Sequence, residues 1–400
     1  MLMYIDSRMY RLGNARNVIR EMYEYGKSRA EIVGRENIYD FTLGNPAVEP
    51  PSSLNATMID ILSTEPSIQV HGYTSAQGDA ACRDAIAKDL NARYGTHFHK
   101  DNFYLTCGAA SALAISLGAI IVPECNEVIA IAPYFPEYGV FTENAGGKFI
   151  VVPPDVPDFQ IDMEKLEAAI NPKTRALIVN SPNNPCGGVY SEETVIKLAN
   201  LLRRKSEEYG HAIVLISDEP YREIVYDGLE LPFLTKYYDN TIVCYSYSKA
   251  LSIPGERFGY VLVPDEMEDS VRVYLAVCGA GRSYGYICAP SLLQRTIAKV
   301  TGQVSDVNEY KKNRDLLYEG LTQIGYECVK PQGAFYLFVK ALESDTAAFC
   351  ERCKALDLLV VSGEGFGCPG YIRLAYCVDY DMIKRSLPVF RKLYESYSKA

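Results

Sequence analysis

Seven short apolar runs separated by helical patterns are the feature that most restricts what this chain can fold into. Most of the runs are rich in Val and Ile and lack strict polar alternation, which is typical of strands buried on both faces. They are Phe103–Thr106, Val128–Ile131, Phe149–Val152, Ala176–Val179, Ala212–Ile216, Ile242–Tyr245 and Phe258–Val263. Helical patterns at Met163–Ile170 and at Glu192–Tyr209, the latter preceded by Ser191 as N-cap, lie between them. The alternation predicts an α/β fold with a mostly parallel seven-stranded sheet flanked by helices.

The pattern changes after about residue 280. One long helical stretch, Ala289–Ile324, is followed by strand-like runs at Ala334–Val339, Leu358–Val361 and Tyr371–Ala375. These elements predict a smaller α+β domain. The first forty residues are helical and charged and are too short to form a domain alone, so we expect them to pack on the small domain or on a partner subunit. The predicted division is 1–44 for this N-terminal segment, 45–285 for the large domain and 286–400 for the small C-terminal domain.

Composition narrows the choice of partners and compartment. The 400 residues include 40 basic and 50 acidic side chains, a net charge of −10, which argues against nucleic acid or an anionic membrane as the main partner. No apolar run is long enough to span a membrane, and the N-terminus lacks a signal-peptide core. Twelve cysteines without paired spacing predict reduced thiols in the cytoplasm. Cys350 and Cys353 form a single CxxC without a second pair, so we expect no metal site.

Polar and small residues follow five of the predicted strands. Ligands of open α/β sheets bind at the carboxyl ends of the strands, so these residues are expected to face one crevice. They form the segments Cys107–Ser111, Pro133–Pro136, Asn180–Pro185, Ser217–Tyr221 and Ser246–Lys249. The convergence of a small-residue helix start, an aromatic ring, amides, a carboxylate and a lysine predicts a binding site more strongly than any one segment does.

The small-residue helix start suits an anion. Backbone N–H groups at Gly108, Ala109 and Ala110 would point at a phosphate from a helix N-terminus, although a plain tight turn is an equal explanation. Further contacts are expected from Ser246, Ser248 and Arg257.

Three other side chains suggest a flat, charged ligand. Phe135 can stack on a ring, unless it is an ordinary core aromatic. Asp218 ends a buried strand and would suit a protonated heteroaromatic nitrogen, the alternative being a helix cap or a structural ion pair. Lys249, desolvated and near Arg257, would favour its neutral, nucleophilic amine, whereas most lysines are solvated surface charges.

These segments resemble the motifs of a known family. The motifs are Leu43-Gly44-Asn45-Pro46, Gly72-Tyr73-Thr74-x3-Gly78, Asn180-x-Pro182-x-Asn184-Pro185-x-Gly187, Asp218-x-x-Tyr221, Ser246-x-Ser248-Lys249-x4-Pro254-Gly255-x-Arg257-x-Gly259 and Gly363-x-x-Phe366-Gly367-x-x-Gly370-x-x-Arg373. In this order they resemble fold-type I, pyridoxal-phosphate-dependent aminotransferases of class I and II. The resemblance runs from about residue 40 to the C-terminus.

The resemblance implies roles around the cofactor pyridoxal 5′-phosphate. Lys249 would form the internal aldimine and then move the Cα proton of the substrate. Asp218 would keep the ring nitrogen protonated. Tyr221 and Asn184 would hydrogen-bond the ring oxygen, and Phe135 would stack on the ring, with Tyr134 as the second choice.

The resemblance also implies substrate contacts and a partner. Arg373 would bind the α-carboxylate, and Gly44 belongs to the substrate loop. Tyr73 would reach the phosphate of the neighbouring subunit, which implies a homodimer. Arg282 is a further candidate that would recognise a distal carboxylate of aspartate or glutamate, unless it contacts phosphate or forms an interface ion pair.

The activity implied is amino-group transfer between an L-amino acid and a 2-oxo acid by ping-pong kinetics. A C–S β-lyase, or another non-transaminating enzyme with the same cofactor residues, is the main alternative, because the outcome depends on which Cα bond is aligned. The second alternative is a non-enzymatic, ligand-sensing domain of a transcription regulator. Such a protein needs an attached DNA-binding module, for which the N-terminal segment is too short and the chain too acidic.

Overall fold

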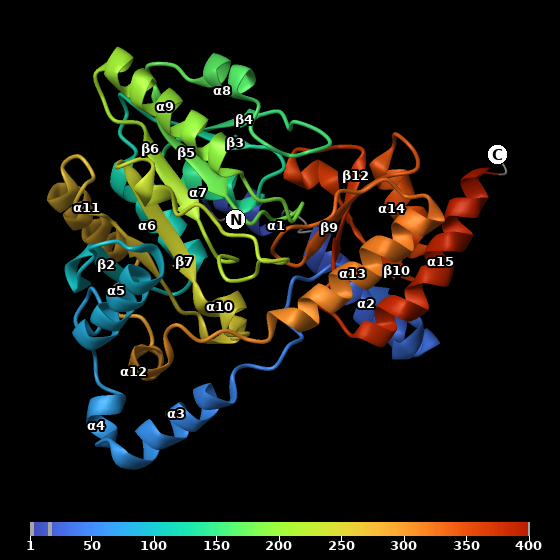
Figure 1. Ribbon diagram of the computed structural model, residues 1–400, viewed down its shortest axis with the longest axis horizontal. Coiled ribbons are helices and arrows are strands. Elements are labelled where there is room, and N and C mark those ends of the chain that lie inside the picture. The colour runs from blue at the N-terminus through green and yellow to red at the C-terminus, as the bar shows by residue number, and fades with distance from the viewer. Residues whose placement is uncertain (1–3, 15–17, 399–400) are drawn as a thin grey trace.

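A seven-stranded sheet forms the centre of the fold (Figure 1), in a computed structural model that describes residues 4–14 and 18–398. In spatial order its strands are β2 (Phe103–Thr106), β8 (Gly259–Leu262), β7 (Thr241–Ser246), β6 (Val214–Asp218), β5 (Thr174–Asn180), β3 (Glu127–Ile131) and β4 (Lys148–Val152). Strand β8 is antiparallel to both its neighbours, and the other pairs are parallel. The seven predicted strands and the mostly parallel sheet are therefore confirmed.

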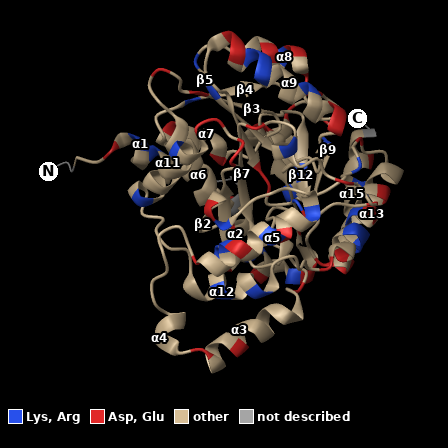
Figure 2. Cartoon of the chain, turned by 60° about the vertical axis from the view of Figure 1, so that its left-hand side comes forward, with Lys and Arg blue, Asp and Glu red and all other residues tan. Residues whose placement is uncertain are grey.

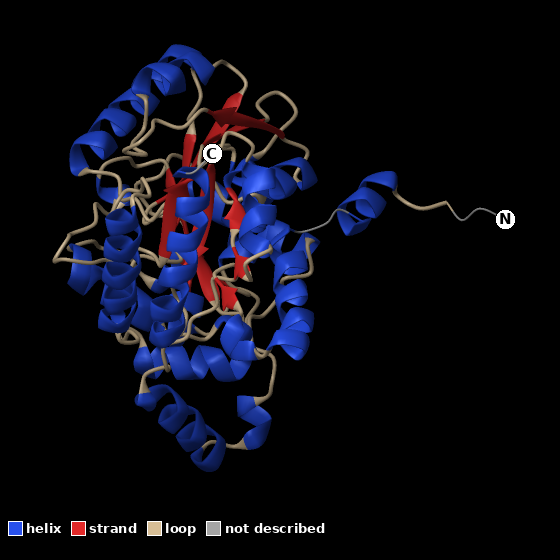
Figure 3. Cartoon of the chain, turned by 90° about the vertical axis from the view of Figure 1, so that its right-hand side faces the viewer, coloured by secondary structure: helices blue, strands red, loops and turns tan. Residues whose placement is uncertain are grey.

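Helices cover both faces of this sheet (Figure 3). Successive residues of a strand point to opposite faces, so Ile178 packs in the core that holds α6 and α11, whereas Leu177 packs with α8 and α9. The helices around the sheet are α3 (Ser52–Thr64), α4 (Ser67–Val70), α5 (Ala80–Tyr94), α6 (Ala109–Ile120), α7 (Glu137–Asn144), α8 (Met163–Ala169), α9 (Glu192–Tyr209), α10 (Tyr247–Ala250), α11 (Ser270–Ser283) and α12 (Ser291–Val300). The side chain of Ser191 caps α9 by accepting a hydrogen bond from the N–H of Thr194, as predicted.

A smaller α+β unit follows the sheet. Strands β11 (Val361–Ser362), β12 (Tyr371–Ala375) and β9 (Tyr336–Lys340) form an antiparallel sheet, and β1 (Tyr39–Asp40) pairs in parallel with β10 (Leu358–Leu359). Its helices are α13 (Val307–Ile324), α14 (Thr346–Lys354) and α15 (Tyr380–Ser398). The run predicted as one strand, Leu358–Val361, is thus divided between two sheets.

The single long helix expected at 289–324 is wrong, because the chain breaks between α12 and α13. Gly302 adopts a positive φ of 87° within the break, a conformation that favours glycine. Asp306 then caps α13 by accepting a hydrogen bond from the N–H of Asn308. As a result α12 packs against α3 and α5, beside the large sheet.

The N-terminal helices α1 (Ser7–Asn14) and α2 (Val18–Val33) pack in different places. The Arg8 guanidinium donates a 3.4 Å hydrogen bond to the carbonyl of Val140 on α7, while most of α1 projects from the molecule (Figure 3). Helix α2 packs on the small unit through the 2.8 Å ion pair between Arg29 and Asp357. Within residues 4–14 and 18–398, no helix has the length and apolar character needed to cross a membrane.

Candidate active site

Residues from five strand ends line one cavity of about 170 Å³ at the carboxyl edge of the large sheet. Its walls are Ala109, Ala110, Leu113, Phe135, Asn180, Asn184, Asp218, Pro220, Tyr221, Ser246, Ser248, Lys249, Pro254 and Arg257. Arg257 reaches this edge because it precedes β8, which runs opposite to the other strands. The structure therefore brings together the side chains that the strand ends were expected to place in one crevice.

The carboxylate of Asp218 lies at the floor of the cavity. Asp218 is only 5% exposed, and its Oδ2 accepts a 2.5 Å hydrogen bond from the hydroxyl of Tyr138 on α7. Its Oδ1 is buried without a hydrogen-bond partner among the residues described. Burial raises the pKa of Asp218 to about 7, against the opposing effect of the Tyr138 hydrogen bond. This half-satisfied buried carboxylate is suited to a cationic N–H donor from a ligand.

Two asparagines hold the neighbouring wall. Asn180 is paired with Asp218 in the register of β5 and β6, and its Nδ2 donates to the backbone carbonyl of Asp218 at 2.8 Å. Its Oδ1 accepts a 2.8 Å hydrogen bond from the N–H of Asn184. These two hydrogen bonds of the Asn180 side chain fix the turn that carries Asn184 relative to Asp218.

Lys249 enters the cavity from α10, the short helix that follows β7. Its Nζ donates a 2.6 Å hydrogen bond to the carbonyl of Gly44 and lies 5.5 Å from the ring centroid of Phe335. Burial lowers the pKa of Lys249 to about 8, and the positive charges of Arg257 and Arg373 act in the same direction. The combination of burial and a nearby arginine that the sequence predicted is present.

The turn before α6 forms a cradle closed by Arg257. Gly108 is the N-cap of α6 with a φ of 90°, and a Cβ built on it would stand 2.8 Å from Nη2 of Arg257. The guanidinium donates to the carbonyl of Cys107 at 3.2 Å and to Oγ of Ser248 at 3.4 Å. The hydroxyl of Ser246 in turn donates to that of Ser248 at 2.8 Å. Free N–H groups at a helix start beside an arginine suit a phosphate.

Tyr221 and Arg373 connect the cavity to the small unit. The hydroxyl of Tyr221 lies 2.8 Å from that of Tyr336 on β9. Arg373, on β12, is 3% exposed, and its Nη1 donates to Oδ1 of Asn184 at 3.0 Å. Its Nε has no hydrogen-bond partner within the described part of the chain. A buried guanidinium with a free N–H beside the cavity is placed to receive a carboxylate.

The remaining predicted residues divide into two groups. Phe135 lines the cavity, and its ring meets that of Tyr138 edge-on at 5.7 Å. Tyr134 instead packs its ring against Phe149. Tyr73 is fully exposed and Arg282 is exposed in the last turn of α11, and neither lines the cavity of its own chain.

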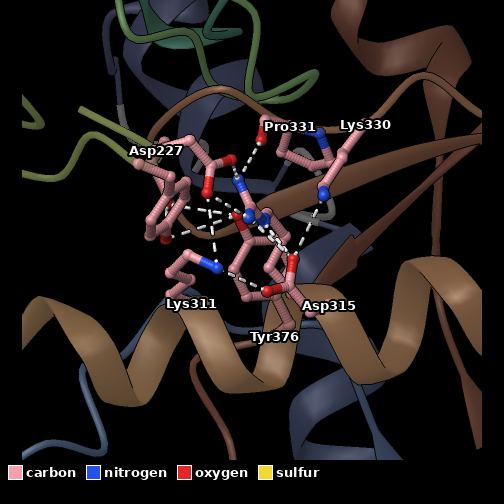
Figure 4. Close-up of polar contacts among 9 residues, drawn as sticks. Asp227, Lys311, Asp315, Lys330, Pro331 and Tyr376 are labelled. Atoms are coloured by element: carbon pink, nitrogen blue, oxygen red, sulfur yellow. Dashed lines mark hydrogen bonds and ion pairs between the residues drawn. The ribbon is translucent and has the colours of Figure 1, made fainter. Parts of the chain in front are cut away.

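A buried arginine, Arg314, holds Asp227 in the chain segment that follows Tyr221. Figure 4 shows the polar contacts of this region, with Asp227, Lys311 and Asp315 labelled. Arg314 on α13 is 1% exposed and donates to both carboxylate oxygens of Asp227, at 2.8 and 3.2 Å, and to Asp315 at 2.9 Å. Its guanidinium lies 4.6 Å from the ring centroid of Tyr226. Since Asp227 follows β6 and Arg314 belongs to α13 of the small unit, this network connects the two units.

Sequence reasoning missed Tyr138, Tyr336 and the bridging role of Asn180. Asn180 stood inside a recognised motif at a strand end, so its position was a usable signal. Tyr138 lies three residues after Phe135, and a turn there, closed by the 3.1 Å hydrogen bond from the Tyr138 N–H to the Phe135 carbonyl, brings both residues to the same crevice. Tyr336 lies 115 residues from its partner Tyr221, and nothing local in the sequence indicates that contact.

The comparisons with known proteins agree with this geometry. Residues 36–389 match the family described as "Aminotransferase class I and II". The chain belongs to the class I and II aminotransferase family. A "Probable aspartate aminotransferase" of Methanocaldococcus jannaschii is 33% identical over 81% of this chain and 85% of its own length. An amino transferase structure from Eubacterium rectale is 58% identical, with a TM-score of 0.97 over 99% of this chain and all of that one. The aspartate aminotransferase from Thermus thermophilus with maleate is 26% identical, with a TM-score of 0.84 over 98% of this chain and all of that one.

Family membership establishes the reaction class and the cofactor. Aminotransferases of class I and II depend on pyridoxal phosphate, and the chain is a transferase that moves an amino group between an amino acid and a 2-oxo acid. The relatives' names support transamination, and nothing in them favours the C–S β-lyase alternative. The cavity fits the cofactor, because the free Oδ1 of Asp218 suits a pyridinium N–H and the cradle of Gly108 and Arg257 suits a phosphate.

Proposed function

We propose that Lys249 holds the cofactor covalently and moves the substrate proton during transamination. The observation that carries this proposal is the position of its amine, which lies in the cavity, where it donates to the Gly44 carbonyl and shares the lining with Arg257. A neutral amine is required both to attack an aldehyde and to act as a base. The lowered pKa of Lys249, about 8, makes the neutral form accessible near physiological pH.

The other cavity residues would hold the cofactor by its different parts. Asp218 would pair with the ring nitrogen, Tyr221 and Asn184 would bond the ring oxygen, and Phe135 would stack on the ring. The phosphate would lie at the N–H groups of residues 108–110, with Ser246, Ser248 and Arg257 around it. When bound, the cofactor supplies an electron sink for the Cα of the amino acid.

Arg373 and Gly44 would position the substrate. A carboxylate bound to Arg373 would be held by a charge-assisted fork, which fixes the direction of the Cα–H bond. The Gly44 carbonyl accepts a hydrogen bond from the Lys249 amine and so holds that amine in the cavity. Lys249 would take the proton from Cα and deliver a proton to the former aldehyde carbon of the cofactor. Hydrolysis would then release the 2-oxo acid and leave the amino group on the cofactor, and a second 2-oxo acid would be processed by the reverse sequence.

The direct test is the variant Lys249→Ala, with the exposed Lys197→Ala as its matched control. We expect transamination to fall by about a thousandfold or more in Lys249→Ala and to stay unchanged in the control. Borohydride treatment of the wild-type enzyme, followed by peptide mapping, should place the cofactor label on residue 249. A label on another lysine, or native half-reaction rates in Lys249→Ala, would refute the proposal.

We propose aspartate as the amino acid of one half-reaction and the pair of glutamate and 2-oxoglutarate as the other, so that 2-oxoglutarate accepts the amino group and leaves as glutamate. Support comes from the relatives, several of which are named aspartate aminotransferases. An amino-acid panel with 2-oxoglutarate, measured by product formation, tests the choice. Arg282→Gln should lower the activity on aspartate more than on an aromatic amino acid if Arg282 recognises a distal carboxylate. Equal losses would favour a phosphate contact or an interface ion pair.

A homodimer with Tyr73 acting across the interface is also proposed. Its support is the exposure of Tyr73 together with exposed large apolar side chains on α3, α4 and α11. Figure 2 shows where these helices lie in the chain. These side chains are Ile59, Leu62, Ile68, Val271 and Leu275. Such exposed apolar groups favour a protein contact.

Subunit mixing tests this arrangement. Dimers that combine a Lys249→Ala chain with a Tyr73→Ala chain contain one site with both defects and one native site if Tyr73 acts across the interface. The activity of the mixture should then exceed the mean activity of the two variants measured separately, because the native sites form only on mixing. If Tyr73 served its own chain, every site would carry one defect and no activity would return.

Domain limits and compartment remain proposals as well. We propose the division 1–44 for the N-terminal segment, 45–285 for the large domain and 286–400 for the small domain. Helix α12 lies within the last range but packs on α3 and α5 of the large domain, so a boundary near residue 300 is the alternative. Twelve free cysteine thiols support a reducing compartment such as the cytoplasm. Limited proteolysis should cut near these boundaries, and thiol titration of the purified protein should count twelve.

A further inference from the structure

Tyr336 touches three of the groups around the cavity although it does not line the cavity itself. It is the first residue of β9 and is buried. Its hydroxyl lies 2.8 Å from that of Tyr221, and its ring centroid lies 4.7 Å from the guanidinium carbon of Arg373. Its hydroxyl also fills the space at Gly44 where any side chain would stand. One buried phenol thus contacts the residues proposed for the ring oxygen, the substrate carboxylate and the lysine.

The number of hydrogens that each phenol can donate decides which of the two hydroxyls is the donor in their hydrogen bond. Each hydroxyl has one hydrogen to donate and can accept others. If Tyr221 donates its hydrogen to a cofactor oxygen, its contact with Tyr336 requires Tyr336 to be the donor. A phenol that accepts a hydrogen bond becomes a stronger donor, because hydrogen bonds in a chain polarise one another. Tyr336 would therefore strengthen the hydrogen bond that Tyr221 makes.

The ring of Tyr336 acts on a different residue. The Arg373 guanidinium lies over this ring and also over that of Phe366, whose centroid is 5.0 Å away. No carboxylate pairs with Arg373 in the described structure, where its side-chain acceptors are the Asn184 amide and the carbonyl of Thr42. An aromatic face stabilises such a cation without occupying its N–H groups. The ring therefore leaves the guanidinium free for a substrate carboxylate.

We propose that Tyr336 is a positioning residue with two separable functions: its hydroxyl orients and strengthens Tyr221 as a donor to the cofactor, and its ring supports Arg373 for the substrate carboxylate. The inference rests on the proposed roles of Tyr221 and Arg373.

Two substitutions at position 336 separate the functions. Tyr336→Phe removes the hydroxyl and keeps the ring, whereas Tyr336→Leu removes both. The first readout is the pH midpoint of the visible absorbance change of the cofactor-loaded enzyme, which does not depend on turnover. Weaker hydrogen bonding to the cofactor oxygen should raise this midpoint by about 0.5 to 1 pH unit in both variants. The second readout is KM for the amino acid, which should rise about tenfold in Tyr336→Leu alone.

Tyr221→Phe and the double variant Tyr221→Phe/Tyr336→Phe supply the reference. Tyr221→Phe should raise the midpoint, and the double variant should show no further rise, because the hydroxyl of Tyr336 acts through Tyr221. Tyr326→Phe, which removes a buried hydroxyl that donates to the carbonyl of Phe390, should leave both readouts unchanged. Cofactor stoichiometry checks that each variant is folded.

The outcomes distinguish the inference from the function on which it rests. A shift in Tyr221→Phe with none in Tyr336→Phe would overturn the role of the Tyr336 hydroxyl alone, as would additive shifts in the double variant. No shift in Tyr221→Phe would overturn the assignment of Tyr221 and the hydroxyl's role with it. An equal KM in Tyr336→Phe and Tyr336→Leu would overturn the role of the ring.

Discussion

The hydroxyl of Tyr138 donates a 2.5 Å hydrogen bond to Oδ2 of Asp218 and leaves Oδ1 of that carboxylate without a partner among the described residues. The single hydrogen bond fixes the carboxylate in one orientation and favours its ionised form, against a burial that raises its pKa to about 7. Within residues 4–14 and 18–398, no cationic side chain pairs with Asp218, so its free oxygen can accept a hydrogen bond from a bound cation.

Tyr138→Phe should weaken the binding of pyridoxal phosphate about tenfold, because the buried carboxylate loses the donor that favours its charge. The measurement is the dissociation constant of the cofactor, obtained by absorbance titration of the cofactor-free protein. Tyr238→Phe is the control, since it removes a hydroxyl that donates to the carbonyl of Ile213 elsewhere under the sheet. Native affinity in Tyr138→Phe would show that the hydrogen bond has no bearing on the cofactor.

Gly108→Ala should impair the phosphate cradle. The added Cβ would stand 2.8 Å from Nη2 of Arg257, at a φ of 90° that an alanine rarely adopts. Strain and displacement of the guanidinium should together weaken cofactor binding by about tenfold to a hundredfold. Gly255→Ala tests the specificity of the effect, because a Cβ at Gly255 meets nothing within 4 Å. Equal losses in both variants would contradict the cradle.

The sequence predicted the sheet and most of the cavity because both depend on local patterns. A buried strand reads as a continuous apolar run, and in parallel strands the next polar residues reach the same edge, as Asp218 and Lys249 do. Contacts that form only when distant segments pack together have no comparable local pattern in the sequence. Tyr336 comes from another sheet, and its hydroxyl meets Tyr221 only after the two units associate. The break around Gly302 was missed because a single glycine is tolerated inside a helical pattern and does not by itself mark the end of a helix.

Asp227→Asn should destabilise the link between the two units. It removes one of two carboxylates that neutralise Arg314, whose burial makes a lost partner costly, although Asp227 itself is half exposed to solvent. We expect the free energy of unfolding to fall by about 1–3 kcal/mol, measured by urea denaturation. Asp269→Asn removes the partner of the exposed Arg272 and should cost under about 0.5 kcal/mol. Similar costs in the two variants would show that the burial of Arg314 adds nothing.

The amine of Lys249 should titrate near pH 8 in the cofactor-free protein, well below its ordinary value of 10.5. Burial is the main cause, because it disfavours the ammonium form, and Arg257 and Arg373 add repulsion. Below pH 8 the neutral fraction, and with it the rate of acetylation by a small anhydride, should fall about tenfold per pH unit. Above pH 8 the rate should level off. Competitive labelling with mass spectrometry of the Lys249 peptide measures this profile.

Arg257→Gln separates the two causes of that lowered pKa. Removal of one nearby positive charge should move the midpoint of Lys249 upward, but by less than the full distance to 10.5, because burial persists. The exposed Lys197 on α9 provides an internal reference for reagent decay in every sample. A wild-type midpoint close to 10.5 would mean that the amine is solvated, and the neutral nucleophile that the proposed chemistry needs would then be scarce at pH 7.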